Sequence, residues 1–182
     1  MSTNLEALPR TIPVATLDVV ALNGNPRASS RTAALTRHVA MEIAGHVAGL
    51  ERARLVEIDL AAPQEPGEDR VATLRGATIA VIASPTYKAT YTGLLKTLLD
   101  SVPHDGLADV IAIPMMVAGD RVHALAVELH LRPVLVELGA ITPTRGLFFE
   151  ESQLAAPGPV LDPWLARARP VLDALVAAGL TS

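Results

Sequence analysis

The sequence of 182 residues contains no cysteine. Disulfide bonds, thiol nucleophiles and cysteine-based metal sites are therefore excluded, and a reducing cytoplasm fits this composition. Aromatic residues are also scarce, because there are only two Phe, two Tyr and one Trp. The core must accordingly be built from Ala, Val, Leu and Ile. The formal net charge is −4, so we expect no basic surface for nucleic acid.

Long apolar runs are missing as well. No run reaches the roughly 18 residues that a membrane-spanning helix needs, and the N-terminus lacks the basic and apolar regions of a secretory signal. Residues 1–14 contain two prolines and no periodicity, so we predict a flexible tail that could pack on a partner subunit. Residues 15–182 are predicted to form a single domain, because this length suits one domain and half of the chain is hydrophobic, enough for a core. The absence of cysteine leads us to expect a cytoplasmic location.

Strand and helix patterns alternate along this domain. Short apolar or alternating runs predict strands, and apolar residues three or four apart predict helices. This alternation is typical of an α/β fold, a doubly wound parallel sheet of five strands in the flavodoxin-like order 2-1-3-4-5. Ligands would then bind beyond the carboxyl ends of strands 1, 3 and 4. The expected strands are 17–22, 54–60, 77–83, 110–117 and 140–149, and the expected helices are 32–47, 92–102, 122–138 and 161–180.

The loop after the first expected strand reads GNPRASSRT, from Gly24 to Thr32. It offers amide, hydroxyl and guanidinium donors just before a helix, whose free N–H groups and positive dipole end favour an anion. The glycine patterns of dinucleotide and nucleoside triphosphate sites are absent. A single terminal phosphate, as in FMN, suits such a loop. The alternative is an ordinary Ser/Thr helix cap beside solvated arginines.

Both tyrosines of the chain lie in the segment SPTYKATYTGLLKTLLD, residues 84–100, where an apolar strand gives way to a helix. Pro85 fixes a turn there and has no N–H. The segment would present backbone groups, Tyr87 and Tyr91 to a flat, partly polar ring, with Lys88 as a nearby cation. The alternative is that the two tyrosines lie four apart on a helix and only pack together.

These two segments closely resemble the NAD(P)H-dependent FMN reductases of the flavodoxin-like flavoproteins. The similarity is greatest to the branch that supplies reduced flavin to two-component monooxygenases, such as those of alkanesulfonate metabolism. Further matches are the tripeptide DGL at 105–107 and the segment HALAVELHLRPVLVELGA at 123–140. The resemblance extends over residues 18–153, and its tyrosine-rich segment is the most specific part.

The resemblance implies that the cofactors are FMN and NAD(P)H. Its implied site consists of phosphate contacts, ring contacts and a third loop. The phosphate contacts would be Asn25, Arg27, Ser30, Arg31 and Thr32, the ring contacts Pro85, Thr86, Tyr87 and Lys88, and the third loop Ala118, Gly119 and Asp120. No catalytic acid or base is implied, because the cofactor carries the chemistry.

Two positions depart from the family pattern. Asn25 stands where the family often has Ser, and an amide can still donate to a phosphate. Ala118 replaces the first of two consecutive glycines, so its methyl group would crowd the flavin ring or tighten the loop.

Pro133 interrupts the helix expected at 122–138, because it has no N–H and its ring would clash with the carbonyl of Leu129. Either a simple kink or a one-residue π-bulge would relieve the clash. Some flavin-releasing relatives carry an extra, often aromatic, residue here at a subunit interface. This chain has Leu129-His130, so our hypothesis is a bulge without aromatic stacking, and a regular helix over 126–133 would contradict it.

Metal sites and hydrolase chemistry find no support. His123 and His130 would lie about 10.5 Å apart along a regular helix, too far to share a metal ion. The G-x-S-x-G pattern of serine hydrolases is absent.

The sequence thus predicts an NAD(P)H:FMN oxidoreductase that transfers a hydride to FMN and supplies reduced flavin to a monooxygenase. One alternative is a quinone, azo or metal reductase with fixed FMN, and another is a binding module without turnover. Apolar helix faces, such as that of LLKTLLD, and the family resemblance indicate a homodimer or homotetramer. The sequence does not choose between NADH and NADPH.

Overall fold

The computed structural model describes residues 16–47 and 52–178. The predicted tail at 1–14 lies outside these residues. Five parallel strands form one sheet in the order β2-β1-β3-β4-β5, which confirms the predicted topology. The strands are β1 (Leu17–Asn23), β2 (Ala53–Asp59), β3 (Ile79–Pro85), β4 (Ile111–Ala118) and β5 (Leu147–Glu150).

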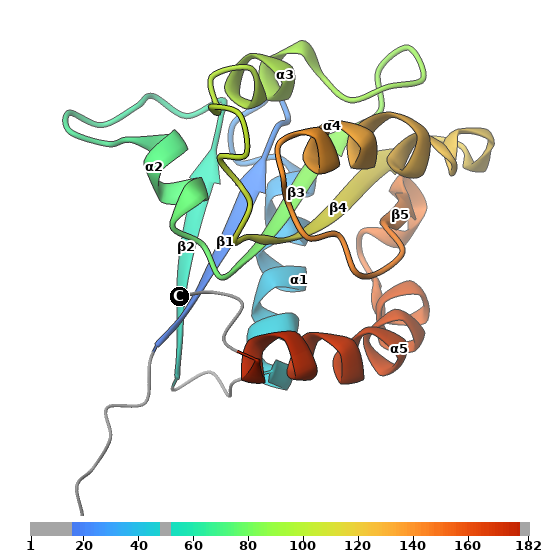
Figure 1. Cartoon of the computed structure of the whole chain (residues 1–182). Coiled ribbons are helices and arrows are strands. Elements are labelled where there is room, and N and C mark those ends of the chain that lie inside the picture. The colour runs from blue at the N-terminus through green and yellow to red at the C-terminus, as the bar shows by residue number, and fades with distance from the viewer. Residues whose placement is uncertain (1–15, 48–51, 179–182) are drawn as a thin grey trace, which may run out of the picture.

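Helices cover both faces of the sheet (Figure 1). One face carries α1 (Arg31–Val47) and α5 (Gly158–Ala177). The other face carries α2 (Arg70–Arg75), α3 (Gly93–Leu99), the π-helix η3 (Val127–Leu131) and α4 (Arg132–Glu137). Two short 3₁₀ turns, η2 (Arg121–His123) and η4 (Glu151–Gln153), follow β4 and β5. No described helix is long and apolar enough to cross a membrane.

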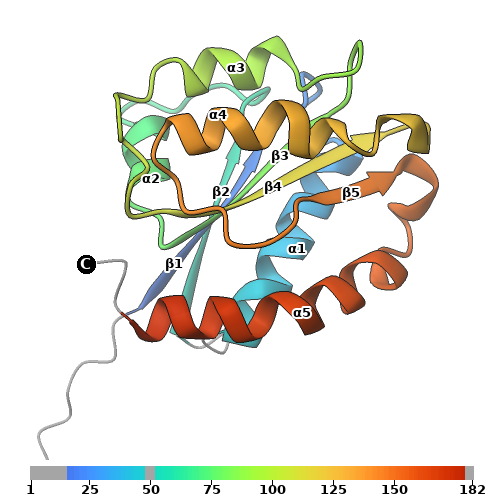
Figure 2. The same ribbon diagram turned by 45° about the vertical axis from the view of Figure 1, so that its right-hand side comes forward.

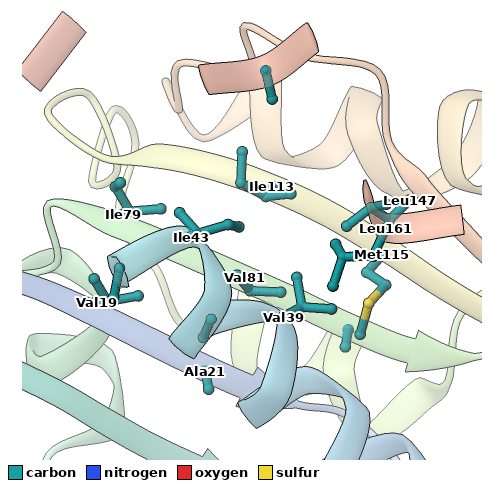
Figure 3. Close-up of a cluster of buried hydrophobic side chains, with 14 of the residues drawn as sticks. Val19, Ala21, Val39, Ile43, Ile79, Val81, Ile113, Met115, Leu147 and Leu161 are labelled. Atoms are coloured by element: carbon teal, nitrogen blue, oxygen red, sulfur yellow. The ribbon is translucent and has the colours of Figure 1, made fainter. Parts of the chain in front are cut away.

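The core is mainly aliphatic, as the composition predicts, and also includes the fully buried Phe149, Met115 and Met116. Beneath α1 and α5, branched side chains of β1, β3 and β4 interdigitate with those of the helices (Figure 3). Val39 and Ile43 of α1 are fully buried, and so are Val81 of β3 and Ile113 of β4. Every residue of β3 and β4 is buried, which explains why these strands read as continuous apolar runs.

The expected strand at 140–149 is wrong in extent. Ile141 makes only an isolated parallel bridge to Ile111, and β5 proper begins at Leu147. Arg132 explains the intervening loop, because its guanidinium donates to the carbonyls of Thr142 and Thr144. Pro143 between them has no N–H to offer a neighbouring strand.

The segment with Pro133 contains the predicted bulge. Val127–Leu131 is a π-helix, and the N–H of Arg132 donates to the carbonyl of Val127, five residues back. Pro133 then stands in the first turn of α4, where a missing N–H costs nothing. The bulge faces outward, since Leu129 within it is 64% exposed. The short α2 was not predicted; it begins at a cap in which Asp69 accepts from Ala72 N–H at 2.9 Å.

Candidate functional site

Three loops meet at the carboxyl edge of the sheet. They follow β1, β3 and β4, which are adjacent strands, so the predicted contacts at 25–32, 85–88 and 118–120 all lie at this edge. Figure 2 shows the strand ends and the start of α1 on the same side of the molecule. The sheet therefore brings together all three segments that the sequence singles out.

The loop after β1 is held by its own asparagines. Asn25 is buried, its Oδ1 accepts from Arg27 N–H at 2.9 Å, and its Nδ2 donates to Thr32 Oγ1 at 3.1 Å. The Asn25 N–H in turn donates to Asn23 Oδ1 at 3.2 Å. The Asn25 amide is thus used to shape the loop rather than left free for a ligand.

The charged side chains of this loop are both cationic. Arg27 is exposed, and Arg31 is exposed with an ion pair to Glu151 at 2.9 Å. Ser30 caps α1, because its Oγ accepts from Ala33 N–H at 3.1 Å. The first turn of α1 contains no acidic residue, and its leading N–H groups have no partner within the helix. This combination suits a phosphate group.

Sequence reasoning missed Asp59, the last residue of β2. Its Oδ2 accepts from Ser29 N–H at 3.0 Å, and its Oδ1 accepts from Asn23 Nδ2 at 3.1 Å. Ser29 has a φ of 52°, so this contact holds a strained backbone in place. A cavity of about 420 Å³ beside the loop is lined by Ser29, Ser30, Glu57 and Asp59. Glu57 is paired with Arg37 at 2.7 Å, so Asp59 is the carboxylate that disfavours an anion there. A polar residue that ends a strand next to β1 is the signal that could have identified Asp59.

The first two loops are tied together by Thr92. Its Oγ1 donates to Gly24 O at 2.6 Å and accepts from Leu95 N–H at 3.2 Å, which caps α3. Gly24 must be glycine, because a Cβ there would lie 2.7 Å from the Cβ of Leu95. The Ser84 Oγ at the end of β3 accepts a hydrogen bond from Thr92 N–H at 3.0 Å, which holds Thr92 in place. The loops after β1 and β3 therefore form one rigid unit.

The tyrosine segment forms a hairpin instead of a helix. Tyr87 and Thr90 exchange two backbone hydrogen bonds of 2.8 and 3.2 Å around Lys88 and Ala89. Both central residues have positive φ, 51° and 68°, in a turn that usually contains glycine or asparagine. Tyr87 projects into solvent, while Tyr91 packs against the core. The alternative of two tyrosines stacked along one helix is therefore wrong.

Thr86 carries the clearest sign of a ligand. Its N–H donates to Val117 O at 2.7 Å, yet its buried Oγ1 has no hydrogen-bond partner among the described residues. An unpaired buried hydroxyl costs free energy unless a partner arrives. Pro85 is buried beside it, and exposed Lys88 lies two residues on.

The third loop follows β4. Ala118 is buried as the last residue of that strand, and Gly119 and Asp120 are exposed. Asp120 caps η2 by accepting from Val122 N–H at 2.8 Å. The described residues contain no cluster of three or more metal-ligating side chains. This edge therefore combines a loop with two exposed arginines, a buried hydroxyl without a partner and a third, flanking loop.

Known proteins are similar to this chain in sequence and in fold. The sequence pattern of the NADPH-dependent FMN reductases matches residues 17–154. A protein named FMN reductase (NADPH) from Escherichia coli is 32% identical over 142 residues, 75% of this chain and 74% of that one. The NADH-dependent FMN reductase SfnE of Pseudomonas putida is 31% identical over 150 residues, 76% and 80% of the two chains.

Two further comparisons agree. An FMN reductase (NADPH) of Pseudomonas putida KT2440 is 43% identical over 75 residues, 41% of this chain and only 38% of that protein. Among solved structures, the apo form of an NADH:FMN oxidoreductase superposes with a TM-score of 0.70 at 28% identity, covering 90% of each chain.

Proposed function

The chain belongs to the family of NADPH-dependent FMN reductases, and from that premise we propose how its residues serve the reaction. It is an NAD(P)H:FMN oxidoreductase with FMN and NAD(P)H as its cofactors. The proposed reaction is hydride transfer, in which NAD(P)H and one proton reduce FMN to FMNH₂ and NAD(P)⁺ is released. FMN supplies the redox chemistry, and the protein supplies position and electrostatics.

The proposed FMN phosphate lies on the outer side of the loop after β1. Arg27 and Arg31 would meet its charge, and the start of α1 at Ser30 and Thr32 would provide N–H groups. Asn25 would act indirectly, by holding the loop in shape. The Asp59 carboxylate lines a cavity beside the loop together with Ser30 and would repel a phosphate placed there, so we propose that the phosphate lies away from Asp59.

The proposed binding site for the isoalloxazine ring of FMN lies between the loops after β3 and β4. The Thr86 hydroxyl is the single observation that carries it, since a polar edge of the ring would satisfy this buried group. Pro85, Tyr87 and Lys88 would border the ring on one side. Ala118, Gly119 and Asp120 would border it on the other.

We further propose that FMN is an exchangeable substrate. Its phosphate would contact two exposed arginines, of which Arg31 is already ion-paired with Glu151. The negative charge of Asp59, which binds the backbone of the same loop, would also weaken phosphate binding. An exposed phosphate site with a competing carboxylate binds an anion less tightly than a buried site whose arginines are free, because solvent and salt screen exposed charges. Reduced FMN would then leave to supply a flavin-dependent monooxygenase. Fixed FMN with a quinone, azo or metal acceptor is the competing function.

A homo-oligomer is proposed from the surface around the π-helix. Val122, Leu129 and Val136 are large apolar side chains that stay exposed in the single chain. Neighbouring apolar groups on one surface are typical of protein interfaces. We propose that a second copy covers them, in a dimer or a tetramer located in the cytoplasm.

The deciding experiment is aerobic oxidation of NADH and NADPH by the purified protein, with FMN titrated from zero. Oxidation that starts near zero and saturates with added FMN is expected for an exchangeable flavin. A full rate without added FMN, from protein that purifies yellow, would establish a fixed cofactor instead. No oxidation of either nucleotide at any FMN concentration would contradict the proposed reaction.

A further inference from the structure

A second cavity lies along the free edge of the sheet. Its volume is about 600 Å³, within the range of small-molecule sites. Strand β5 pairs with β4 on one side only, and the cavity opens on its other side, between η3 and α5. Figure 2 shows β5 at this edge, with α4 on one side and α5 on the other. No predicted flavin contact lines this cavity.

The cavity begins next to the third loop of the candidate site. Glu150, which lines it, is paired in register with Ala118, and neighbouring strands lie about 4.8 Å apart. Arg121 also lines it and follows Asp120 directly. From Glu150 the cavity continues along β5, whose four residues rise about 10 Å, to Arg145 in the preceding loop. A long ligand resting on the flavin could therefore extend into it.

The charge of the cavity is positive. Arg121, Arg145 and Arg167 line it, and none of them forms an ion pair with an acidic side chain of the described residues. Two carboxylates, Glu128 and Glu150, also line the cavity, but both accept hydrogen bonds from the protein itself. Glu128 binds Arg132 and accepts from Gly146 N–H at 2.7 Å, while the Glu150 side chain accepts from the backbone of η4. Three guanidinium groups without a carboxylate partner thus line the cavity; that of Arg167 donates through Nε to Pro163 O at 3.0 Å and keeps its terminal N–H groups for an anionic ligand.

The walls of the cavity are aromatic and apolar. Trp164 and Phe148 line it, and the indole N–H of Trp164 donates to Arg145 O at 2.7 Å, which fixes the orientation of the ring. Thr144 also lines the cavity, and its buried Oγ1 has no partner in the described part of the chain. A flat base with hydrogen-bonding edges and phosphate groups matches these features.

We propose that this cavity binds the adenosine half of NADPH, with the 2′-phosphate on its arginines, and so makes the enzyme prefer NADPH over NADH. The proposal rests on the proposed function, because the nicotinamide end must lie at the flavin. NADH lacks the 2′-phosphate, so the arginines discriminate between the two nucleotides. Guanidinium groups suit this role because they bind phosphate through two parallel hydrogen bonds.

Trp164 allows a binding test that does not depend on turnover, since it is the only tryptophan of the chain. Its fluorescence would be titrated with 2′,5′-ADP and with 5′-ADP in the full-length protein, with and without FMN. We expect 2′,5′-ADP to change the emission and to bind at least about tenfold more tightly than 5′-ADP. Equal affinities, or no change with either compound, would overturn the proposal.

Substitutions test the same cavity by kinetics. Arg145→Gln and Arg167→Gln should each lower the ratio of kcat/KM for NADPH to kcat/KM for NADH by about tenfold. Arg75→Gln is the matched control, because Arg75 is exposed on α2 and does not line the cavity. A ratio unchanged in both variants would refute the cavity as the adenosine site. Oxidation of neither nucleotide by the unaltered protein would refute the reductase reaction instead, and the fluorescence titration would still decide on the cavity.

Discussion

The Asp59 carboxylate at the end of β2 accepts a hydrogen bond of 3.0 Å from the N–H of Ser29, thirty residues earlier in the chain. This contact fixes the loop proposed to hold the FMN phosphate, although Asp59 itself carries the wrong charge to bind it. Asp59 therefore acts on the ligand through the backbone of the loop.

Removing this carboxylate tests its positioning role. Asp59→Ala frees Ser29 N–H and Asn23 Nδ2, so KM for FMN should rise about fivefold, because the lost loop contact of about 1 kcal/mol outweighs the relief of a repulsion that solvent screens. Asp59→Asn should raise KM less, because the amide oxygen can still accept and the repulsion of phosphate is gone. Asp109→Ala, at an exposed loop position, is the control. Steady-state kinetics with FMN varied would refute this role if Asp59→Ala left KM unchanged.

The Thr86 hydroxyl allows ligand binding to be separated from stability. Thr86→Val keeps the shape and removes a buried hydroxyl that has no partner in the FMN-free chain. The free energy of unfolding without FMN should stay the same or increase, whereas KM for FMN should rise about fivefold. Thr97→Val on the exposed face of α3 should leave KM unchanged. Urea unfolding and kinetics on both variants would disprove the ring contact if Thr86→Val bound FMN normally.

Glu128 should make stability depend on pH. Hydrogen bonds from Arg132, followed by that from Gly146 N–H, lower the pKa of Glu128 in the folded protein. The pairing therefore stabilises the fold above the ordinary carboxyl pKa of about 4.3, and this stabilisation is lost as the pH falls through the lower folded pKa.

The corresponding variant is Glu128→Gln. At pH 7 it should lower the free energy of unfolding by about 1–3 kcal/mol, because it breaks hydrogen bonds made to charged groups. Between pH 5 and pH 3, by contrast, it should lose less stability than the unaltered protein. Urea unfolding across this range measures both, and parallel pH profiles for the two proteins would contradict the assignment.

The apolar surface around η3 predicts an effect on assembly. Leu129→Glu places a charge on the side chain proposed to contact a second copy, so the mass in solution should fall to that of a smaller oligomer or a monomer. His130→Glu adds the same charge at the neighbouring exposed position and should have the smaller effect. Light scattering during gel filtration measures the mass. An unchanged mass for Leu129→Glu would place the interface elsewhere.

The sequence predicts those parts of the fold that depend on local pattern. Strands β3 and β4 were visible because both of their faces are buried. Pro133 predicted an interruption of the helix but left a kink and a π-bulge open, and the structure contains the bulge. The extent of β5 was wrong, because Arg132 binds the carbonyls of Thr142 and Thr144 from another element. Helix α2 was missed because its six residues bury only Leu74.

For the candidate site, too, the sequence predicts the features that depend on local pattern and misses those that depend on distant residues. The three loops were predicted because each follows an apolar strand, and the sheet order brings them together. The inward turn of the Asn25 amide and the contacts of Asp59 and Thr92 depend on residues far apart in the chain. No local pattern encodes these contacts, so only the folded structure reveals them.

The π-helix at Val127–Leu131 also bears on how this segment can vary in evolution. One turn of a π-helix holds one residue more than a turn of an α-helix, and here the bulge bears the exposed Leu129-His130 pair. A gain or loss of one residue at this point changes the exposed face and leaves the buried Val127 and Leu131 as anchors on either side. Relatives aligned with this chain should therefore tolerate a single-residue gap here, and such a gap would alter which surface meets another subunit while sparing the core.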